Sequence, residues 1–369
     1  MLIGPREGIQ DYSGIFQGCL DAIRNGEPCA KGILRIARGR YLIGETLRLG
    51  DGTRLEFDEG AELLMEMSKA GCILFTNADH VGGNRGISIR GGSFAGGILL
   101  RNCVDFTLES FAIRNDGYAI TLDGAEDFLV SRIHIDQRGE RRVNQDGVHV
   151  FGPACRGIIR EISGTAWDDM VALNADDNDG IHGPISDILI DGVHCDRTYN
   201  FVRLMSRGSV VTRIRIRDIR GTSTVNGGFV IGAHRFDPRA SGFGEISLDD
   251  IDIAYANAID DYATLRLNGN IESLRISRLR RRDAYPSALL SIYAGVRIGK
   301  LELENIERIL VVPESQVGTS TLAGETAPLG EVFAGSYAPS LMKVDGEIGE
   351  LCARNVVSRI AIGNQASGA

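Results

Sequence analysis

The chain has 369 residues, of which 43% are hydrophobic, with 47 glycines, 9 prolines and a formal net charge of −9. This composition predicts a folded core and excludes a disordered chain, which combines low hydrophobicity with high net charge. The negative charge argues against a nucleic-acid partner, because a phosphate-binding surface is basic. No apolar stretch reaches the length of a membrane span, so we expect no membrane partner.

The first predicted element is a helix over residues 12–26, with the sequence YSGIFQGCLDAIRNG. Ile15, Cys19, Leu20 and Ile23 share one face of this helix at the helical period. The residues before it lack the charged start and apolar run of a signal peptide. We therefore expect a protein that is cytoplasmic, or exported with its leader removed.

Short β-type runs recur along most of the remaining chain, each with apolar residues alternating on either side of a two-residue kink. When the runs are aligned on their later apolar residue, successive steps are 22, 29, 31, 26, 32, 28 and 27 residues. The runs lie at residues 106–113, 128–135, 157–162, 188–195, 214–219, 246–253, 274–279 and 301–306, and the aligned residues are Phe111, Ile133, Ile162, Val193, Ile219, Ile251, Leu279 and Ile306.

A repeat of this length, built from short strands and Gly, Asn or Asp turns, cannot bury its inner face alone and must stack on its neighbours. No helix follows each strand, which argues against a TIM barrel or a doubly wound sheet. A propeller needs blades of about 40 residues or more. The pattern therefore predicts an all-β fold, a single-stranded right-handed parallel β-helix with coils about 4.8 Å apart.

The ends of such a solenoid must be covered, and the helix at 12–26 would cover the N-terminal end. Residues 317–340 are rich in Gly, Ser and Thr and are interpreted as an insertion loop before the last strands. No domain boundary is evident, so we expect residues 1–369 to form one β-helix domain.

Residues 144–177 concentrate acidic side chains within this apolar pattern. Asp146 lies 22 residues before Asp168 and 23 before Asp169, which is one coil. We therefore expect the three carboxylates to meet on one surface, along the groove that one sheet of a β-helix presents. Crowded carboxylates repel, so at least one pKa rises and a proton stays available near neutral pH. An acid beside ionised carboxylates is the arrangement that glycoside hydrolysis needs.

Two stretches resemble known families. The opening, DYSGIFQGCLDAI followed by GILRIARGRYLIGETLRLGDGTRLEFDEGAEL, is similar to the start of the pectate-lyase-like β-helix superfamily. NQDG at 144–147, followed one coil later by WDDMVALN at 167–174, resembles the paired aspartate motifs of glycoside hydrolase family 28, the polygalacturonases. The resemblance implies an inverting hydrolase with Asp168 as general acid, Asp146 and Asp169 holding and deprotonating the water, and Asn144 orienting the site.

The chain departs from that family at its next two motifs. Where the family has Gly-His-Gly and Arg-Ile-Lys, this chain reads TYNFVRLMS at 198–206 and NGGFVIGAHR at 226–235. In the family the Arg/Lys pair reads the uronate carboxylate, so polygalacturonan is not the expected substrate. Four cations are candidates for a substitute role: Arg203, His234, Arg235 and Arg266.

Three further residues are candidate sugar contacts. His149 either lines the groove or is a satisfied structural histidine, and we favour the structural role. Trp167 either stacks on a sugar and lifts the pKa of the acid, or belongs to the core. Tyr199 lies where the family's histidine loop would be.

Asp176 and Asp177 are interpreted as solvated loop residues. Together with the trio they also offer oxygen ligands for calcium, although no cofactor or metal is expected to be required.

The expected partner is a carbohydrate, with no prediction of the oligomeric state. Two alternatives to hydrolysis stay open. One is a polysaccharide lyase on the same fold, whose base would have to be an arginine, because no lysine lies within residues 70–299. The other is a non-catalytic glycan-binding β-helix of the spike or adhesin type. Fold alone does not discriminate among the three.

Overall fold

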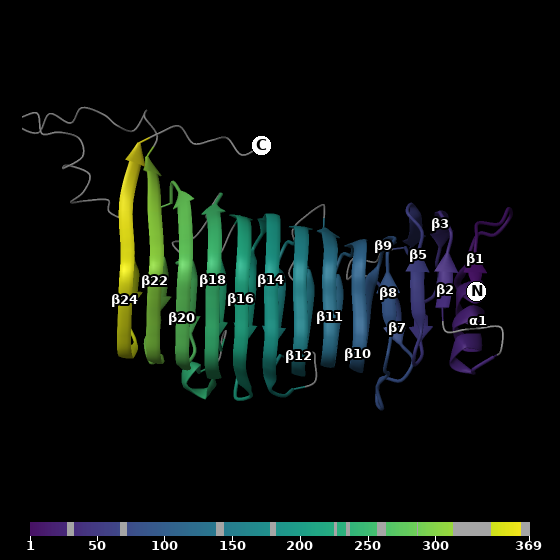
Figure 1. The fold of residues 1–369 in the computed structure, drawn as a ribbon, viewed down its shortest axis with the longest axis horizontal. Coiled ribbons are helices and arrows are strands. Elements are labelled where there is room, and N and C mark those ends of the chain that lie inside the picture. The colour runs from purple at the N-terminus through teal and green to yellow at the C-terminus, as the bar shows by residue number, and fades with distance from the viewer. Residues whose placement is uncertain are drawn as a thin grey trace, which may run out of the picture.

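The computed structural model describes residues 1–27, 33–66, 72–137, 144–177, 182–224, 227–233, 237–256, 263–285, 287–312 and 341–362. These residues form a right-handed parallel β-helix with a short N-terminal helix, as the sequence predicts. Long strands stand side by side from α1 at one end to β24 at the other (Figure 1). Where they are described, the strand pairings are all parallel.

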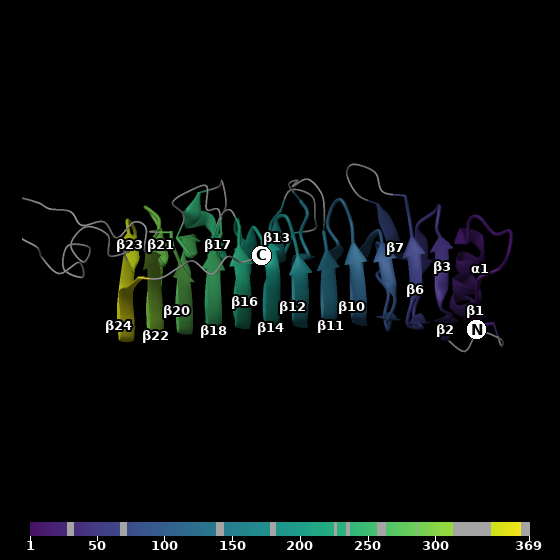
Figure 2. The same ribbon diagram turned by 90° about the horizontal axis from the view of Figure 1, so that it is seen from above.

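The long strands form one continuous ladder, and a second ladder of short strands lies beside it (Figure 2). The long ladder consists of β10 (Gly97–Arg114), β11 (Ile120–Asp136), β12 (Val148–Thr165), β14 (Ile185–Thr198), β16 (Val210–Ser223), β18 (Gly242–Tyr255), β20 (Ile271–Asp283), β22 (Arg297–Val312) and β24 (Glu347–Ile362). The short ladder consists of β13 (Asp169–Asn174), β15 (Asn200–Met205), β17 (Phe229–Gly232), β19 (Leu265–Asn268), β21 (Leu290–Ile292) and β23 (Met342–Val344).

The first coils are built from shorter strands that follow α1 (Ser13–Arg24). They are β1 (Leu2–Ile3), β2 (Ile33–Ile36), β3 (Gly39–Leu42), β4 (Leu47–Leu49), β5 (Arg54–Phe57), β6 (Ala61–Leu64), β7 (Ile73–Asn77), β8 (Ser88–Arg90) and β9 (Ser93–Ala95). A 3-10 turn at Pro238–Ala240 precedes β18.

The kink seen in each sequence repeat is one residue in the left-handed backbone region. It stands directly before the aligned apolar residue in every described coil, with φ between 50° and 75°. An L-residue there costs about 1–2 kcal/mol, least for Gly, Asn and Asp. These residues are Ser110, Arg132, Glu161, Gly192, Asp218, Asp250, Arg278 and Asn305. The bend turns each long strand around the core.

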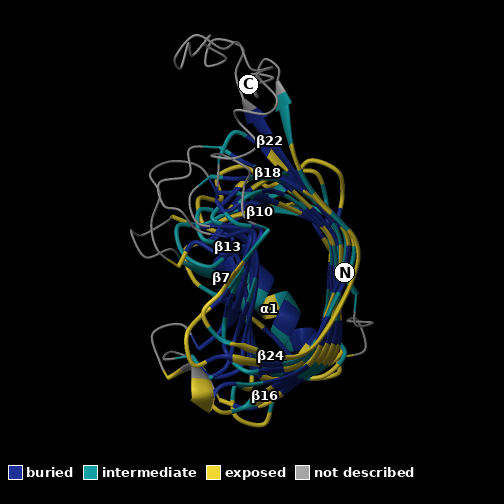
Figure 3. Cartoon of the chain, turned by 90° about the vertical axis from the view of Figure 1, so that its left-hand side faces the viewer, coloured by how far each residue is buried: buried dark blue, intermediate teal, exposed yellow. Residues whose placement is uncertain are grey.

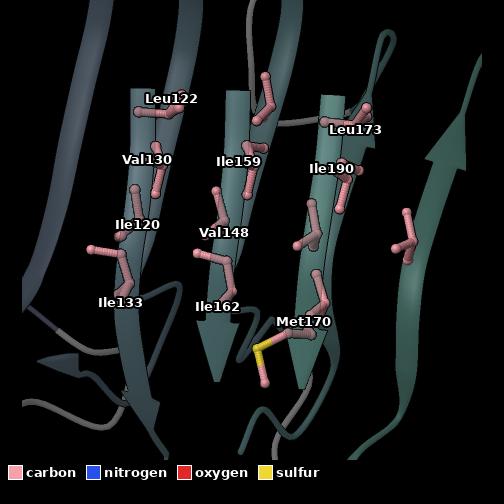
Figure 4. Close-up of a cluster of buried hydrophobic side chains, with 14 of the residues drawn as sticks. Ile120, Leu122, Val130, Ile133, Val148, Ile159, Ile162, Met170, Leu173 and Ile190 are labelled. Atoms are coloured by element: carbon pink, nitrogen blue, oxygen red, sulfur yellow. The ribbon is translucent and has the colours of Figure 1, made fainter. Parts of the chain in front are cut away.

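Apolar side chains stack in register along the interior. Phe111, Ile133, Ile162 and Val193 are successive partners across the coils, and the register continues through the other aligned residues to Ile306. Ile133 and Ile162 lie side by side inside the coil in Figure 4. The end-on view shows buried residues lining the inside and exposed residues on the outer surface (Figure 3). The ladder predicted from the repeat is therefore confirmed residue by residue.

Helix α1 covers the N-terminal end of this interior, as predicted, and begins and ends within two residues of the expected bounds. Phe16, Leu20 and Ile23 belong to the same core cluster as the first coils, and the Phe16 ring lies 5.6 Å from that of Tyr41. Ile15 and Cys19, predicted on the buried face, are only partly buried against it. Phe16 takes the central position because it points directly into the first coil.

Residues 317–340, predicted as an insertion, lie outside the described residues, and the assignment of 1–369 to one domain stays a prediction. Among the described residues, no helix has the length and apolar character needed to cross a membrane.

Replacement of Phe16 tests the capping role of α1. Phe16 is fully buried, so we expect Phe16→Ala to lower the free energy of unfolding by about 3–5 kcal/mol through lost burial and a cavity. Arg24→Ala on the exposed side of the helix is the control and should change it by less than about 0.5 kcal/mol. Urea unfolding followed by circular dichroism measures both. A loss below about 1 kcal/mol for Phe16→Ala would contradict a capping role.

Candidate active site

The acidic residues lie at the N-terminal ends of neighbouring strands in one sheet, which we call the site sheet. It comprises the starts of β11 and β12 together with β13, β15, β17 and β19. Val171 and Leu173 of β13 are buried in the core and stack on the next coil. Asp169 and Asn200 are register partners at the starts of β13 and β15, and the backbone N–H of Gly147 bonds to the carbonyl of Asp169.

The structure brings Asp146, Asp168 and Asp169 together, as their spacing predicts. One carboxylate oxygen from each lies within 4.8 Å of the others. Asp146 precedes β12, Asp168 precedes β13, and Asp169 is the first residue of β13. The stacking of two coils therefore creates the cluster. Asp146 and Asp169 are buried and Asp168 is half-buried.

Both oxygens of Asp169 accept hydrogen bonds from the next coil. Asn200 Nδ2 donates to Oδ1 at 2.5 Å, and Arg203 Nη1 donates to Oδ2 at 3.2 Å. Burial works against the charge of Arg203, but the carboxylates of Asp169, Asp146 and Asp168 outweigh it and raise its pKa. Arg203 is therefore a fixed cation that offsets part of the charge of the trio.

Asp146 lies against His149, three residues further along the chain. Its Oδ2 is 2.5 Å from His149 Nδ1. Burial raises the pKa of Asp146, while the hydrogen bond with His149 opposes the rise. Removal of a carboxylate from water disfavours its charged form, and a donor restores part of what is lost.

Asp168 is the half-buried member of the trio. Burial, and then the charges of Asp169 and Asp146, raise the pKa of Asp168 to about 8. A backbone donor, the N–H of Asn144 at 3.0 Å from Oδ2, lowers it only in part. Asp168 therefore carries a proton at neutral pH beside two further carboxyl groups.

The other residues predicted to contact the sugar lie in different surroundings. Asn144 does approach Asp168, but through its backbone N–H, while its side chain is exposed. His149 is only 2% exposed, and its contact with Asp146 agrees with the structural role that the sequence favours, while its sugar contact stays a prediction. Trp167 is half-buried with the Arg197 guanidinium 5.1 Å from its ring centroid. Tyr199 is half-buried, and its backbone N–H bonds to the carbonyl of Asp168.

Of the four candidate cations, Arg203 contacts Asp169 of the trio, and Arg266 contacts Asn200, which itself bonds to Asp169. Arg266 Nη2 donates to Asn200 Oδ1 at 3.3 Å. His234 and Arg235 lie outside the described residues, so their predicted roles are untested.

The expectation that Asp176 is a solvated loop residue is wrong. It is 7% exposed, and it accepts hydrogen bonds from the backbone N–H groups of Arg207 and Ser209 and from the Ser209 hydroxyl. Asp177 accepts from Asn174 Nδ2 at 2.7 Å. Neither belongs to the group of carboxylates close enough to share an ion, so within the described residues a calcium ion could use only the trio.

Sequence reasoning missed Asn200, although a signal for it was present. Asp146, Asp169 and Asn200 each stand two residues before a buried valine and four before a second buried valine or leucine, in QDGVHV, DDMVALN and NFVRLM. This polar residue, at a fixed offset from the buried residues of its strand, marks the strand end at which the cluster forms. Sequence reasoning also missed Tyr118, whose ring lies 4.5 Å from that of His149.

No protein-family model and no curated protein sequence matches the chain. Its fold is similar to solved β-helix structures. The surface adhesin PfbA of Streptococcus pneumoniae has a TM-score of 0.59 and 14% identity, over 83% of this chain and 84% of its own. A family 28 exopolygalacturonase of Yersinia enterocolitica has a TM-score of 0.59 and 10% identity, over 98% and 78%.

The tailspike protein of E. coli bacteriophage HK620, in complex with a pentasaccharide, has a TM-score of 0.59 and 12% identity, over 84% and 69%. At these identities the likeness is one of fold. The neighbours include a hydrolase, an adhesin and a tailspike, so the fold does not decide the function, which must be argued from the site.

The raised pKa of Asp168 makes a prediction about stability. Because the folded-state pKa lies above the ordinary value, ionisation of Asp168 destabilises the fold as pH rises from about 4 to about 8. Asparagine cannot ionise, so Asp168→Asn should be more stable than wild type at pH 8 by at least about 1 kcal/mol, with a smaller difference at pH 5. Thermal unfolding across this pH range measures it.

Asp176→Asn is the matched control and should behave in the opposite way. Burial would raise the pKa of Asp176, but its hydrogen bonds from Ser209 and Arg207 outweigh burial and lower it. Its stabilisation is present above the ordinary pKa of an aspartate and is lost as pH falls. We expect Asp176→Asn to destabilise the protein by about 1–3 kcal/mol at neutral pH. If both variants shift stability in the same direction at pH 8, the account of the cluster is wrong.

Proposed function

We propose that this protein is a glycoside hydrolase that cleaves a polysaccharide or oligosaccharide with the chemistry of the family 28 enzymes that it resembles. The observation that carries the proposal is the meeting of Asp146, Asp168 and Asp169 at the starts of neighbouring strands, where burial and the two neighbouring carboxylates raise the pKa of Asp168 to about 8. A carboxylic acid that keeps its proton at neutral pH, next to carboxylates that are held by donors, is the combination that glycosidic cleavage requires.

In the proposed reaction Asp168 donates its proton to the glycosidic oxygen as the bond from that oxygen to the anomeric carbon breaks. A water held by Asp146 and Asp169 attacks the anomeric carbon and loses a proton to one of these carboxylates. The negative charges of the pair also stabilise the positive charge that develops on the sugar. The products are two shorter sugars, one of which carries a new reducing end.

The partners of Asp169 favour attack by water over attack by a carboxylate. Both of its oxygens are engaged, by Asn200 and by Arg203, and the Oδ2 atom of Asp146 is engaged by His149. Carboxylates held in this way are suited to orient a water and poorly suited to form a covalent bond. We therefore propose inversion, although the carboxylates lie closer than the about 6.5–9.5 Å found in most inverting pairs.

The state of Arg203 argues against the lyase alternative. A lyase base must release its proton, whereas the neighbouring carboxylates raise the pKa of Arg203 and hold it as a cation. Its Nη1 donates to Asp169, which also argues against a role in reading a uronate carboxylate. A polymer of galacturonate is accordingly not the proposed substrate.

The second candidate function is glycan binding without cleavage. Its support is the fold likeness to the adhesin PfbA together with the departures from the family 28 motifs at 198–206 and 226–235.

Replacement of Asp168 separates cutting from binding. We expect Asp168→Asn to lower kcat by a factor of about 10³ or more, because general acid catalysis and the associated charge stabilisation are lost together. Reducing-end release over a panel of polysaccharides and aryl glycosides measures it, with chelator arms and ultraviolet absorbance to detect lyase products. Asp176→Asn, outside the trio, should keep its activity. Glycan retention by the wild type with no release from any substrate would favour the binding function.

The anomeric configuration of the product tests the role of water. If Asp146 and Asp169 activate a water, the first-formed reducing sugar has the inverted configuration. Proton NMR during the first minutes of hydrolysis, before mutarotation, distinguishes the two anomers. Retention of configuration would identify one of these carboxylates as a nucleophile and overturn the proposed roles.

A further inference from the structure

His149 links the trio to a second group of polar side chains beneath the surface. Its Nδ1 faces Asp146 Oδ2 at 2.5 Å, and its Nε2 faces Asn174 Nδ2 at 3.2 Å. Its ring is packed between Tyr118 and Phe151, with centroid distances of 4.5 and 4.2 Å. His149 is only 2% exposed, so its ring lies inside the protein.

The position of the ring proton follows from Asn174. Its Nδ2 carries two hydrogens, and one of them bonds to Asp177 Oδ2 at 2.7 Å. The opposite orientation of the amide would place its oxygen against that carboxylate, which is unfavourable. The second hydrogen is therefore directed at His149 Nε2, which must hold a lone pair to accept it. Asp177 Oδ2 itself is 3.8 Å from Nε2, too far for a hydrogen bond.

We infer that His149 is a positioning residue for Asp146: it is a neutral imidazole with its proton on Nδ1, which donates to Asp146 Oδ2 and leaves Oδ1 for the water. A series of hydrogen bonds links Asp177, Asn174, His149 and Asp146 in that order. This series fixes the orientation of the Asp146 carboxylate from beneath the site. The catalytic consequence rests on the proposed function, but the protonation state of the ring does not.

The hydrogen bond from His149 to Asp146 has a definite role in the site. Asp146 is faced by His149 of β12, by Asp169 of β13 and Asp168 just before it, and by Arg203 of β15. Burial and Asp169 favour the protonated form of Asp146, in which it cannot accept a proton from water. His149 and Arg203 oppose them, and His149 is the one that bonds to Asp146 directly. Loss of its donor should therefore leave Asp146 protonated to a higher pH.

His149→Asn and His149→Leu form a matched pair. The two side chains have nearly the same size, and both lose the ring contacts, but only asparagine places an N–H near the position of Nδ1. For His149→Leu we expect the acid limb of the kcat/KM profile to move up by about one pH unit, which is about a tenfold loss below that limb. His149→Asn should keep the wild-type limb. KM should stay the same in both, because the inferred task of His149 is to orient Asp146 for the chemical step and not to bind the sugar.

The ring nitrogens provide a readout that needs no activity. With ¹⁵N-labelled histidine, and His149→Asn to assign the signal, we expect Nδ1 to show an attached proton and Nε2 a lone pair at pH 7. A proton on Nε2, or on both nitrogens, would overturn the inference. So would equal pH profiles for the leucine and asparagine variants. If wild type cuts no substrate, the proposed hydrolysis fails while the ring signals still decide the role of His149.

Discussion

The repulsion among three carboxylates is the interaction on which this site depends. One oxygen from each of Asp146, Asp168 and Asp169 lies within 4.8 Å of the others, and within the described residues the guanidinium of Arg203 is the cation bonded to them. Carboxylates free to move would separate into water. The fold holds them together, and burial, added to by the repulsion from Asp169 and Asp146, raises the pKa of Asp168.

The packed interior of the coils that carry the three aspartates resists this repulsion. Asp146 and Asp169 stand directly before strands whose inward residues stack in register, Val148 on Val171 and Val150 on Leu173. These side chains are fully buried, so a shift of either aspartate would disturb a packed interior. Hydrogen bonds from Asn200 and His149 then fix the orientation of the carboxylates. In this solenoid, the register between strands thus brings the charged side chains of successive coils together.

Much of this could be predicted from sequence, because strand alternation and the repeat are local patterns. The ladder from Phe111 to Ile306 and the meeting of the three aspartates depend only on counting coils. Contacts between outward side chains depend also on turn lengths, which vary between coils. Tyr199 was therefore predicted at the site instead of its neighbour Asn200, which is the register partner of Asp169. The burial of His149 depends on Phe151, two residues along the same strand, and on Tyr118, whose contact no period in the sequence indicates.

The protonation state of Asp168 tests the central claim most directly. Selective ¹³C labelling of aspartate carboxyl carbons allows each side chain to be titrated by NMR, and comparison with Asp168→Asn assigns the signal. The account predicts that Asp168 titrates with a midpoint near pH 8, as expected for a buried acid beside two carboxyl groups. A midpoint near about 4, the ordinary value for an aspartate, would contradict it and remove the general acid from the proposed reaction.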